Sequence, residues 1–226
     1  FDDLTAGRAT IDSLRPIVIE DLLGRDSVPT DPELFGQGLR DSVVCVTGAG
    51  GSIGSELCRQ ILQFFPRQLI LLELSEPSLY AIDQALRVGL SKGVELHPVL
   101  GSAADAALVQ RLFKKYGVQV VFHAAAYKHV PLVEANPLTG LINNVCTSRV
   151  VCRAAADAGV NKVMLISTDK AVRPTNVMGA SKRLSELVIQ ASALEALQAA
   201  TGAGPPSTRF SMVRFGNVLD SSGSVV

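Results

Sequence analysis

The feature that most constrains the fold is a regular alternation, from Asp41 onward, between short runs rich in Val, Ile and Leu and longer segments with helical periodicity. Apolar runs without a polar face are typical of parallel strands, because helices cover both faces of a parallel sheet. Six such runs predict a doubly wound parallel α/β sheet of the dinucleotide-binding Rossmann type. The expected strands span residues 42–48, 68–74, 94–101, 118–126, 162–168 and 210–216.

The segments between these runs have the spacing of amphipathic helices. In the first, Ile53, Leu57, Ile61 and Phe65 recur every four residues, which predicts one buried stripe. Similar patterns predict further helices near 105–115, 139–157 and 178–200.

The first 40 residues differ from the rest of the chain. They contain three prolines and only one short amphipathic piece, IVIEDLL, so we expect residues 1–40 to be a lead-in segment. Residues 41–226 are expected to form the dinucleotide-binding domain, with a Gly/Pro-rich loop at 201–207 before the last strand.

Composition argues against several classes of partner. The 226 residues carry no net charge, which argues against a nucleic-acid-binding protein with a basic surface. No apolar run reaches the ~18–20 residues of a membrane span, and no signal-peptide pattern opens the chain. The cysteines lack C-x-x-C spacing and lie in apolar stretches, so we expect reduced core residues, no metal site and a cytoplasmic location. They are Cys45, Cys58, Cys146 and Cys152.

The strongest short motif is VTGAGGSIGSE, at the passage from the first strand to the first helix. Glycines at this place allow a tight turn and bring backbone amides close to a pyrophosphate, whose charge the helix N-terminus stabilises. A spacing like this also occurs in ordinary turns, but its position before an amphipathic helix favours dinucleotide binding. The candidate cofactor contacts are Gly48, Gly51, Ser52, Ile53, Gly54, Glu73, Ser102, Ala124 and Ala125.

Glu73 bears on the choice of cofactor. It lies near the end of the second strand, about 20 residues beyond the loop, where a carboxylate can accept hydrogen bonds from the adenosine ribose. This favours NAD over NADP, because a 2′-phosphate would meet a negative charge. Nearby Ser75 could weaken this discrimination between NAD and NADP. The alternative interpretation is a solvated Glu73 at the end of a strand.

After the fifth strand comes STDKAVRPTNVMGASKR, which brings several reactive side chains to the carboxyl edge of the expected sheet. Ligands of open α/β sheets bind at that edge, so Thr168, Asp169, Lys170 and Lys182 are site candidates. Adjacent Asp169 and Lys170 could hold a proton donor and a proton acceptor if burial moves their pKa values toward neutrality. The alternative is a surface pair in a loop.

At these residues the chain resembles the extended short-chain dehydrogenase/reductase superfamily, whose active site carries Tyr-x-x-x-Lys. Here the motif reads Met178-Gly-Ala-Ser-Lys182. HAAAYKHVPLVEANP, NNV, STDKAVRPTNVMGASK and RFGNVLDSSGSVV together resemble its branch of polysaccharide-biosynthesis nucleotide-sugar 4,6-dehydratases, some of which have Met at the tyrosine position. The resemblance runs from about residue 15 to the end.

The resemblance implies a reaction on UDP-N-acetylglucosamine or a close relative. Bound NAD(P)+ takes hydride from C4, water leaves across C5 and C6, and hydride returns to C6. Asp169 matches the acid at the C6 hydroxyl, Lys170 the base at C5, Thr168 the hydroxyl near O4, and Lys182 the cofactor-ribose contact. The thioether of Met178 cannot exchange protons, so another group must accept the proton of the C4 hydroxyl. We favour a relay from Thr168 through water to Asp169, with Lys182 as the alternative.

Weaker candidates for substrate contacts are Lys128, His129, Asn144, Arg214 and Asn217. The sequence departs from the family pattern at Asp220 and Thr147, where glycine is expected; the second departure should affect helix packing. The family continues beyond Val226 into a small substrate-binding region, so we expect a truncated chain from which most of that region is absent. The resemblance also allows membrane helices before Phe1 in the parent protein, and we expect a homo-oligomer.

Two other functions remain open. A UDP-sugar 4-epimerase shares the C4 oxidation but needs no acid at C6, so Asp169 and Lys170 weigh against it. A noncatalytic dinucleotide-binding module is motivated by Met178, which in that case only fills an apolar gap.

Overall fold

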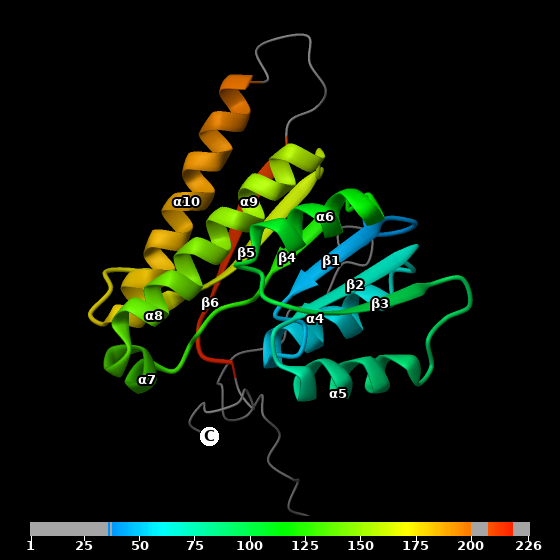
Figure 1. Ribbon diagram of the computed structural model, residues 1–226, viewed down its shortest axis with the longest axis horizontal. Coiled ribbons are helices and arrows are strands. Elements are labelled where there is room, and N and C mark those ends of the chain that lie inside the picture. Colours follow the sequence, from blue (N-terminus) through cyan, green and yellow to red (C-terminus); the bar gives the residue numbers. More distant parts are fainter. Residues whose placement is uncertain (1–35, 37, 200–207, 219–226) are drawn as a thin grey trace, which may run out of the picture. The chain divides into compact units, whose positions relative to one another are not determined.

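The computed structural model describes residues 36, 38–199 and 208–218. In this part of the chain six parallel strands form one sheet in the order β3-β2-β1-β4-β5-β6 (Figure 1). The order reverses between β1 and β4, which confirms the doubly wound fold. The strands are β1 (Val43–Thr47), β2 (Gln68–Glu73), β3 (Glu95–Leu100), β4 (Val120–His123), β5 (Lys162–Thr168) and β6 (Arg209–Phe215).

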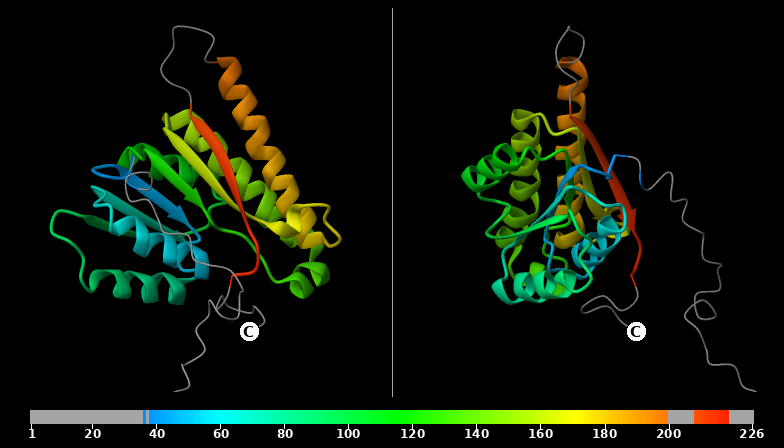
Figure 2. Two further views of the ribbon diagram at one scale, coloured as in Figure 1. Left: turned by 180° about the vertical axis from the view of Figure 1, so that it is seen from behind. Right: turned by 90° about the vertical axis from the view of Figure 1, so that its right-hand side faces the viewer.

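Helices cover both faces of the sheet (Figures 1 and 2). One core cluster joins the sheet to α4 and α5, and the other joins it to α6, α9 and α10. In β1, Val44 and Val46 belong to the first cluster while Val43 and Cys45 belong to the second. Burial on both faces explains why the strands are continuous apolar runs rather than alternating ones.

The helices follow the strands in sequence, and α10 is the longest of those described. Their bounds are α4 (Ser52–Leu62), α5 (Glu76–Arg87), α6 (Ala106–Tyr116), α7 (Val130–Ala135), α8 (Pro137–Leu141), the π-helix η2 (Ile142–Cys146), α9 (Thr147–Ala158), the 3-10 helix η3 (Asp169–Ala171) and α10 (Val177–Ala199). No helix in the described ranges is long and apolar enough to cross a membrane.

Three expectations about the helices need correction. Helix α5 was not expected; Ser75 caps it by accepting from the Ser78 amide, and a proline in its first turn starts the helix rather than breaking it. The expected helix over 139–157 is divided by η2. The expected stripe in the first helix is wrong at Phe65, which is 46% exposed because α4 ends at Leu62.

Two further sequence expectations concern packing. Cys45, Cys58 and Cys152 are buried free thiols, as expected of core residues, whereas Cys146 is half-buried. Burial raises the pKa of Cys58 to about 12. Thr147 is buried at the start of α9, where its hydroxyl donates to the Asn143 carbonyl.

The chain ends fall largely outside the described residues. Of the lead-in segment, residues 36 and 38–40 are described, and Leu39 is part of the core. The loop at 201–207 and Asp220 lie outside the described part.

Candidate active site

The glycine loop joins β1 to α4 at the carboxyl edge of the sheet. Gly48 adopts the left-handed conformation, and a Cβ there would lie 2.7 Å from the backbone of Ala125. At Gly54 a Cβ would lie 2.0 Å from the Gly48 carbonyl oxygen. Both positions therefore require glycine for the fold itself.

Gly51 differs from these two glycines because it is exposed and has extended backbone angles as the N-cap of α4. A Cβ there would meet only the Gly48 carbonyl oxygen, at 3.3 Å. No side chain caps α4, whose first residues are Ser52 and Ile53. An open approach to an uncapped helix start fits the pyrophosphate of a dinucleotide.

The other cofactor candidates lie near this loop or at neighbouring strand ends. Ala124 and Ala125 follow β4, and their amides donate to the Thr47 carbonyl and hydroxyl oxygens, at 3.1 and 3.4 Å. Ser102 follows β3, where its hydroxyl oxygen accepts from the Ala104 amide at 3.1 Å. The topology thus brings all these candidates to one edge of the sheet.

Glu73 is fixed by backbone amides at the end of β2. Its Oε2 accepts from the Gly50 amide of the glycine loop at 3.0 Å. Its Oε1 accepts from the Leu74 and Ser75 amides, each at 2.9 Å. Because a carboxylate has about four lone-pair sites, one remains on Oε2 for a ribose hydroxyl.

Thr168, Asp169 and Lys170 form a connected group where β5 ends. The Thr168 hydroxyl donates to Asp169 Oδ1 at 2.9 Å. Lys170 Nζ donates to Asp169 Oδ1 at 3.4 Å and to Asn217 Oδ1 at 2.9 Å. The structure therefore brings together three expected catalytic residues and one expected substrate contact, from the end of β5, η3 and the segment after β6.

The acid–base pairing of Asp169 and Lys170 was conditional on burial, and in this structure neither side chain is buried. The side chain of Asp169 is 55% exposed and that of Lys170 is 39% exposed. The hydrogen bond from the Thr168 hydroxyl is the largest effect on Asp169; burial opposes it, and the charge and hydrogen bonds of Lys170 add to it, so that the pKa of Asp169 lies below its ordinary value. In this state Asp169 is a carboxylate that can accept a proton.

Met178 and Lys182 lie one turn apart on α10, and both are buried. Lys182 Nζ donates to the Ile166 carbonyl of β5 at 2.7 Å. Burial lowers the pKa of Lys182 to about 8, although the carboxylate of Glu186 opposes this shift.

The remaining substrate candidates fall into two groups. Lys128 and His129 are exposed at the start of α7. Asn144 is buried in η2, where Nδ2 donates to Ser181 Oγ at 2.8 Å and Oδ1 accepts from the Tyr127 amide at 2.7 Å. Arg214 forms a double hydrogen bond with Glu186. Asn144 and Arg214 thus have structural partners, and a direct contact of either with substrate stays a prediction.

Two buried polar residues, Glu186 and His123, lie beside the site; sequence reasoning missed Glu186 and expected His123 to be a hydrogen-bonded structural residue. Glu186 lies four residues after Lys182, a helical spacing that could have revealed it. His123 ends β4, where Thr47 Oγ1 and Ser148 Oγ contact its ring nitrogens at 2.7 and 3.2 Å. Burial, reinforced by the charge of Lys182, lowers the pKa of His123 to about 3, so its ring is neutral at physiological pH.

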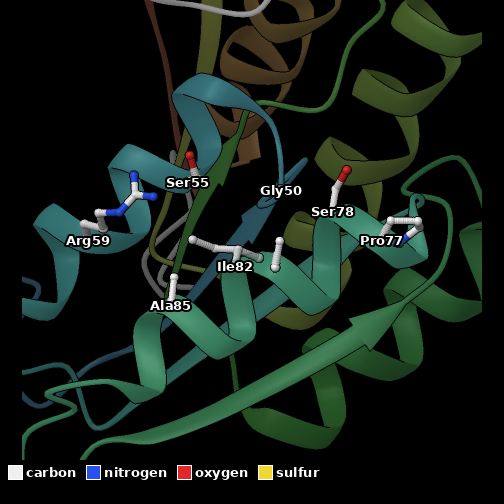
Figure 3. A pocket seen from close by; sticks show the side chains of 8 residues that line it. Gly50, Ser55, Arg59, Pro77, Ser78, Ile82 and Ala85 are labelled. Atoms are coloured by element: carbon white, nitrogen blue, oxygen red, sulfur yellow. The ribbon is translucent and has the colours of Figure 1, made fainter.

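A cavity of about 360 Å³ lies between α4 and α5 (Figure 3), and none of the catalytic candidates lines it. It touches the glycine loop at Gly50, and its other lining residues, such as Ser55, Arg59 and Ser78, belong to the two helices. We therefore locate the site by the residues at the sheet edge rather than by this cavity. Across the described ranges, no cluster of three His, Cys, Asp or Glu side chains could hold a metal ion.

Three relatives have informative names. The chain is 41% identical over its full length to "Capsular polysaccharide biosynthesis protein CapD" of Staphylococcus aureus, of which it covers 36%. It is 33% identical to a "UDP-glucose 4-epimerase" of Rickettsia prowazekii, with 82% of the chain and 52% of the relative covered. It is also 33% identical to a "UDP-N-acetylglucosamine 4,6-dehydratase (inverting)" of Campylobacter jejuni, with 81% and 51% covered.

Solved structures confirm the fold. Pen from Bacillus thuringiensis superposes with a TM-score of 0.72 at 29% identity, covering 83% of this chain and 55% of Pen. DesIV, a dTDP-glucose 4,6-dehydratase from Streptomyces venezuelae solved with NAD bound, gives a TM-score of 0.56 at 27% identity, covering 66% and 51%.

The family comparison covers most of the chain. The model of the family described as "Polysaccharide biosynthesis protein" matches residues 44–226. The chain spans between about a third and a half of the length of the curated relatives named above. Family match and full-length similarity agree, so this chain belongs to the polysaccharide biosynthesis protein family.

Proposed function

We propose that this chain is the nucleotide-binding part of a 4,6-dehydratase that acts on UDP-N-acetylglucosamine or a close relative in polysaccharide biosynthesis. The observation that carries the proposal is the connected group of Thr168, Asp169 and Lys170 at the sheet edge. A hydroxyl, a carboxylate and an amine side by side can accept and donate the protons that a dehydration moves. The Campylobacter relative's name supports this choice of reaction.

The glycine loop and Glu73 suit a nicotinamide dinucleotide, which, when bound, would take hydride from C4 and return it to C6. The start of α4 would hold the pyrophosphate, and the free lone pair of Glu73 Oε2 would accept from the ribose. We propose NAD rather than NADP because the Glu73 carboxylate would repel a 2′-phosphate. NAD in the DesIV structure supports the class of cofactor.

The C4 hydroxyl proton needs an acceptor, because Met178 has none to offer. Thr168 donates directly to Asp169 at 2.9 Å, so the proposed relay needs no bridging water between them. In this route Thr168 takes the sugar proton while passing its own to Asp169. The lowered pKa of Asp169 fits this role, since the group begins as a carboxylate.

The same proton can then serve the elimination. Asp169, once protonated, would donate to the departing C6 hydroxyl, while Lys170 accepts the proton from C5. Lys170 must be a neutral amine for this step, and burial beneath the bound sugar would favour that form. Asn217, 2.9 Å from its Nζ, would keep the amine oriented.

The main alternative is a UDP-sugar 4-epimerase. It is favoured by the epimerase relative, whose identity to this chain equals that of the dehydratase relative. An epimerase would share the C4 oxidation but would give Asp169 and Lys170 no proton to move at C6 and C5. The pair therefore favours dehydration.

Mass spectrometry of the full-length parent protein with UDP-N-acetylglucosamine separates these functions. A dehydratase gives a product lighter by one water, an epimerase an isomer of equal mass, and a noncatalytic module no product. Asp169→Asn and Lys170→Met should each slow water loss by about 10²–10⁴-fold. Near-normal dehydration by both variants would refute the acid and base roles.

A further inference from the structure

Glu186 on α10 has no exposed surface, and the proposed reaction gives it no role. Oε1 accepts from Ser167 Oγ at 2.7 Å and from Arg214 Nε at 2.8 Å. Oε2 accepts from Arg214 Nη2 at 2.7 Å and from Arg183 Nη1 at 2.9 Å. Burial opposes ionisation, but the hydrogen bonds from Arg214, Ser167 and Arg183 outweigh it and lower the pKa of Glu186 to about 2. The carboxylate is therefore charged at physiological pH and fully paired.

The elements that meet at Glu186 all lead into the proposed site. Ser167 directly precedes Thr168. Arg214 lies opposite Ser167 in the register of β5 with β6. Three residues beyond Arg214, Asn217 accepts from Lys170. The carboxylate thus joins the carboxyl ends of two neighbouring strands to α10.

Lys182 lies one turn before Glu186 on the same buried face of α10. Its Nζ binds the Ile166 carbonyl, and Glu186 binds the Ser167 hydroxyl. The two side chains therefore contact successive residues of β5 immediately before Thr168. Residues four apart on a helix are close enough for their charges to interact.

We propose that Glu186 is a positioning residue that holds the ends of β5 and β6 on α10 and keeps Lys182 cationic at the cofactor site. Without this carboxylate, Arg183, Arg214 and Lys182 would be three cations with no buried counter-charge. Attraction from an opposite charge favours the protonated amine, whereas burial alone disfavours it.

The other groups around Lys182 do not obscure its titration. His123 faces it from β4 and stays neutral above its pKa of about 3. Asp169 and Lys170 on η3 are substantially exposed, so solvent screens their charges. Arg214 on β6 stays protonated because its hydrogen bonds with Glu186 raise its pKa. Between pH 6 and 10, Glu186 is therefore a constant negative charge beside a titrating Lys182.

The test is an NMR titration of this chain labelled with ¹³C at lysine Cε, with the Lys182 signal assigned by its loss in Lys182→Met. In Glu186→Gln the pKa of Lys182 should fall by about one unit from its wild-type value. Glu186→Asp keeps the charge and should restore most of the shift. Glu195→Gln makes the same charge change at an exposed position of α10 and should leave Lys182 unchanged. An unchanged pKa in Glu186→Gln would overturn the proposal.

A second variant keeps the test decisive if Glu186→Gln does not fold. Arg214→Gln removes a cation and leaves the carboxylate, so Lys182 should titrate at higher pH; a shift to lower pH would also overturn the proposal. Only the effect on turnover rests on the proposed function: in the parent protein, Glu186→Gln should lower kcat with little change in KM. An inactive wild-type parent protein would count against the function but leave the titration result standing.

Discussion

At the scale of single residues, the glycine loop divides into positions that the fold needs and one, Gly51, that we propose the cofactor needs. A side chain at Gly48 or Gly54 would overlap backbone atoms of neighbouring segments. At Gly51 a Cβ would require a shift of only a few tenths of an ångström. The sequence predicted the loop because all three glycines follow a strand and precede a helix, but glycine spacing cannot distinguish these roles.

Gly51→Val should therefore remove cofactor binding while the protein stays folded. The branched side chain would stand where the pyrophosphate approaches the amides of α4, and losing two or more such hydrogen bonds should weaken NAD by about 100-fold or more. Calorimetric titration measures the affinity, and circular dichroism checks the fold. Gly54→Ala is the contrasting variant, which should destabilise the protein. Undiminished NAD binding by Gly51→Val would remove the loop from the site.

Glu73 should make NAD bind more tightly than NADP. A hydrogen bond between the ribose and a carboxylate is lost when a 2′-phosphate takes its place, which predicts a preference of about tenfold or more. Glu73→Gln removes the repulsion and should bring the dissociation constants for NAD and NADP closer together. Titration of the cofactor-free chain with each dinucleotide measures the two constants. Tighter binding of NADP by the wild type would contradict the assignment.

Thr168 and Met178 provide a matched pair for the C4 proton. Thr168→Val keeps the shape but removes the hydroxyl, and C4 oxidation in the parent protein should fall by about 10²–10⁴-fold. Met178→Leu should keep most of the activity, because the thioether holds no proton. Substrate-dependent NADH absorbance reports the oxidation. Normal oxidation in Thr168→Val would leave Lys182 as the better proton acceptor.

At the scale of elements, the sequence predicted the strands better than the helices. A strand buried on both faces has an unbroken apolar pattern, which the sequence displays directly. Helix α5 was not predicted, although Pro77 suits the first turn of a helix. The π-helix η2 contains Asn144, whose side chain bonds both the amide and the carbonyl of Tyr127, and such long-range pairing has no local signal in the sequence.

Helix α10 carries the buried amine of Lys182, whose effect on the free energy of unfolding depends on pH. The pKa of Lys182 is about 8 in the fold, against 10.5 for an ordinary lysine. The unfolded chain therefore binds more protons between these values, and the free energy of unfolding rises with pH across that window. Lys182→Met should be more stable than the wild type at pH 7, with the difference shrinking from pH 8 to 10.5. Urea denaturation at several pH values measures it. A difference that does not vary with pH would contradict a perturbed Lys182.

At the scale of the whole molecule, the topology assembles residues far apart in sequence at one sheet edge. The sequence predicted this edge for Gly48, Glu73 and Asp169, since each ends or follows a strand of a parallel sheet. It did not predict that Arg214 would turn to Glu186, because that contact depends on how α10 packs against β6. It also left open whether Asp169 and Lys170 would be buried, and among the described residues both side chains are substantially exposed.

The central claim is that this chain contributes to a dehydratase, and the fate of one hydrogen tests it most directly. The full-length parent protein would be given UDP-N-acetylglucosamine with deuterium at C4, and NMR would locate the deuterium in the product. Dehydration with internal hydride return predicts a 4-keto-6-deoxy sugar that carries deuterium at C6. Deuterium that returns to C4 in an epimerised sugar of unchanged mass would contradict the account.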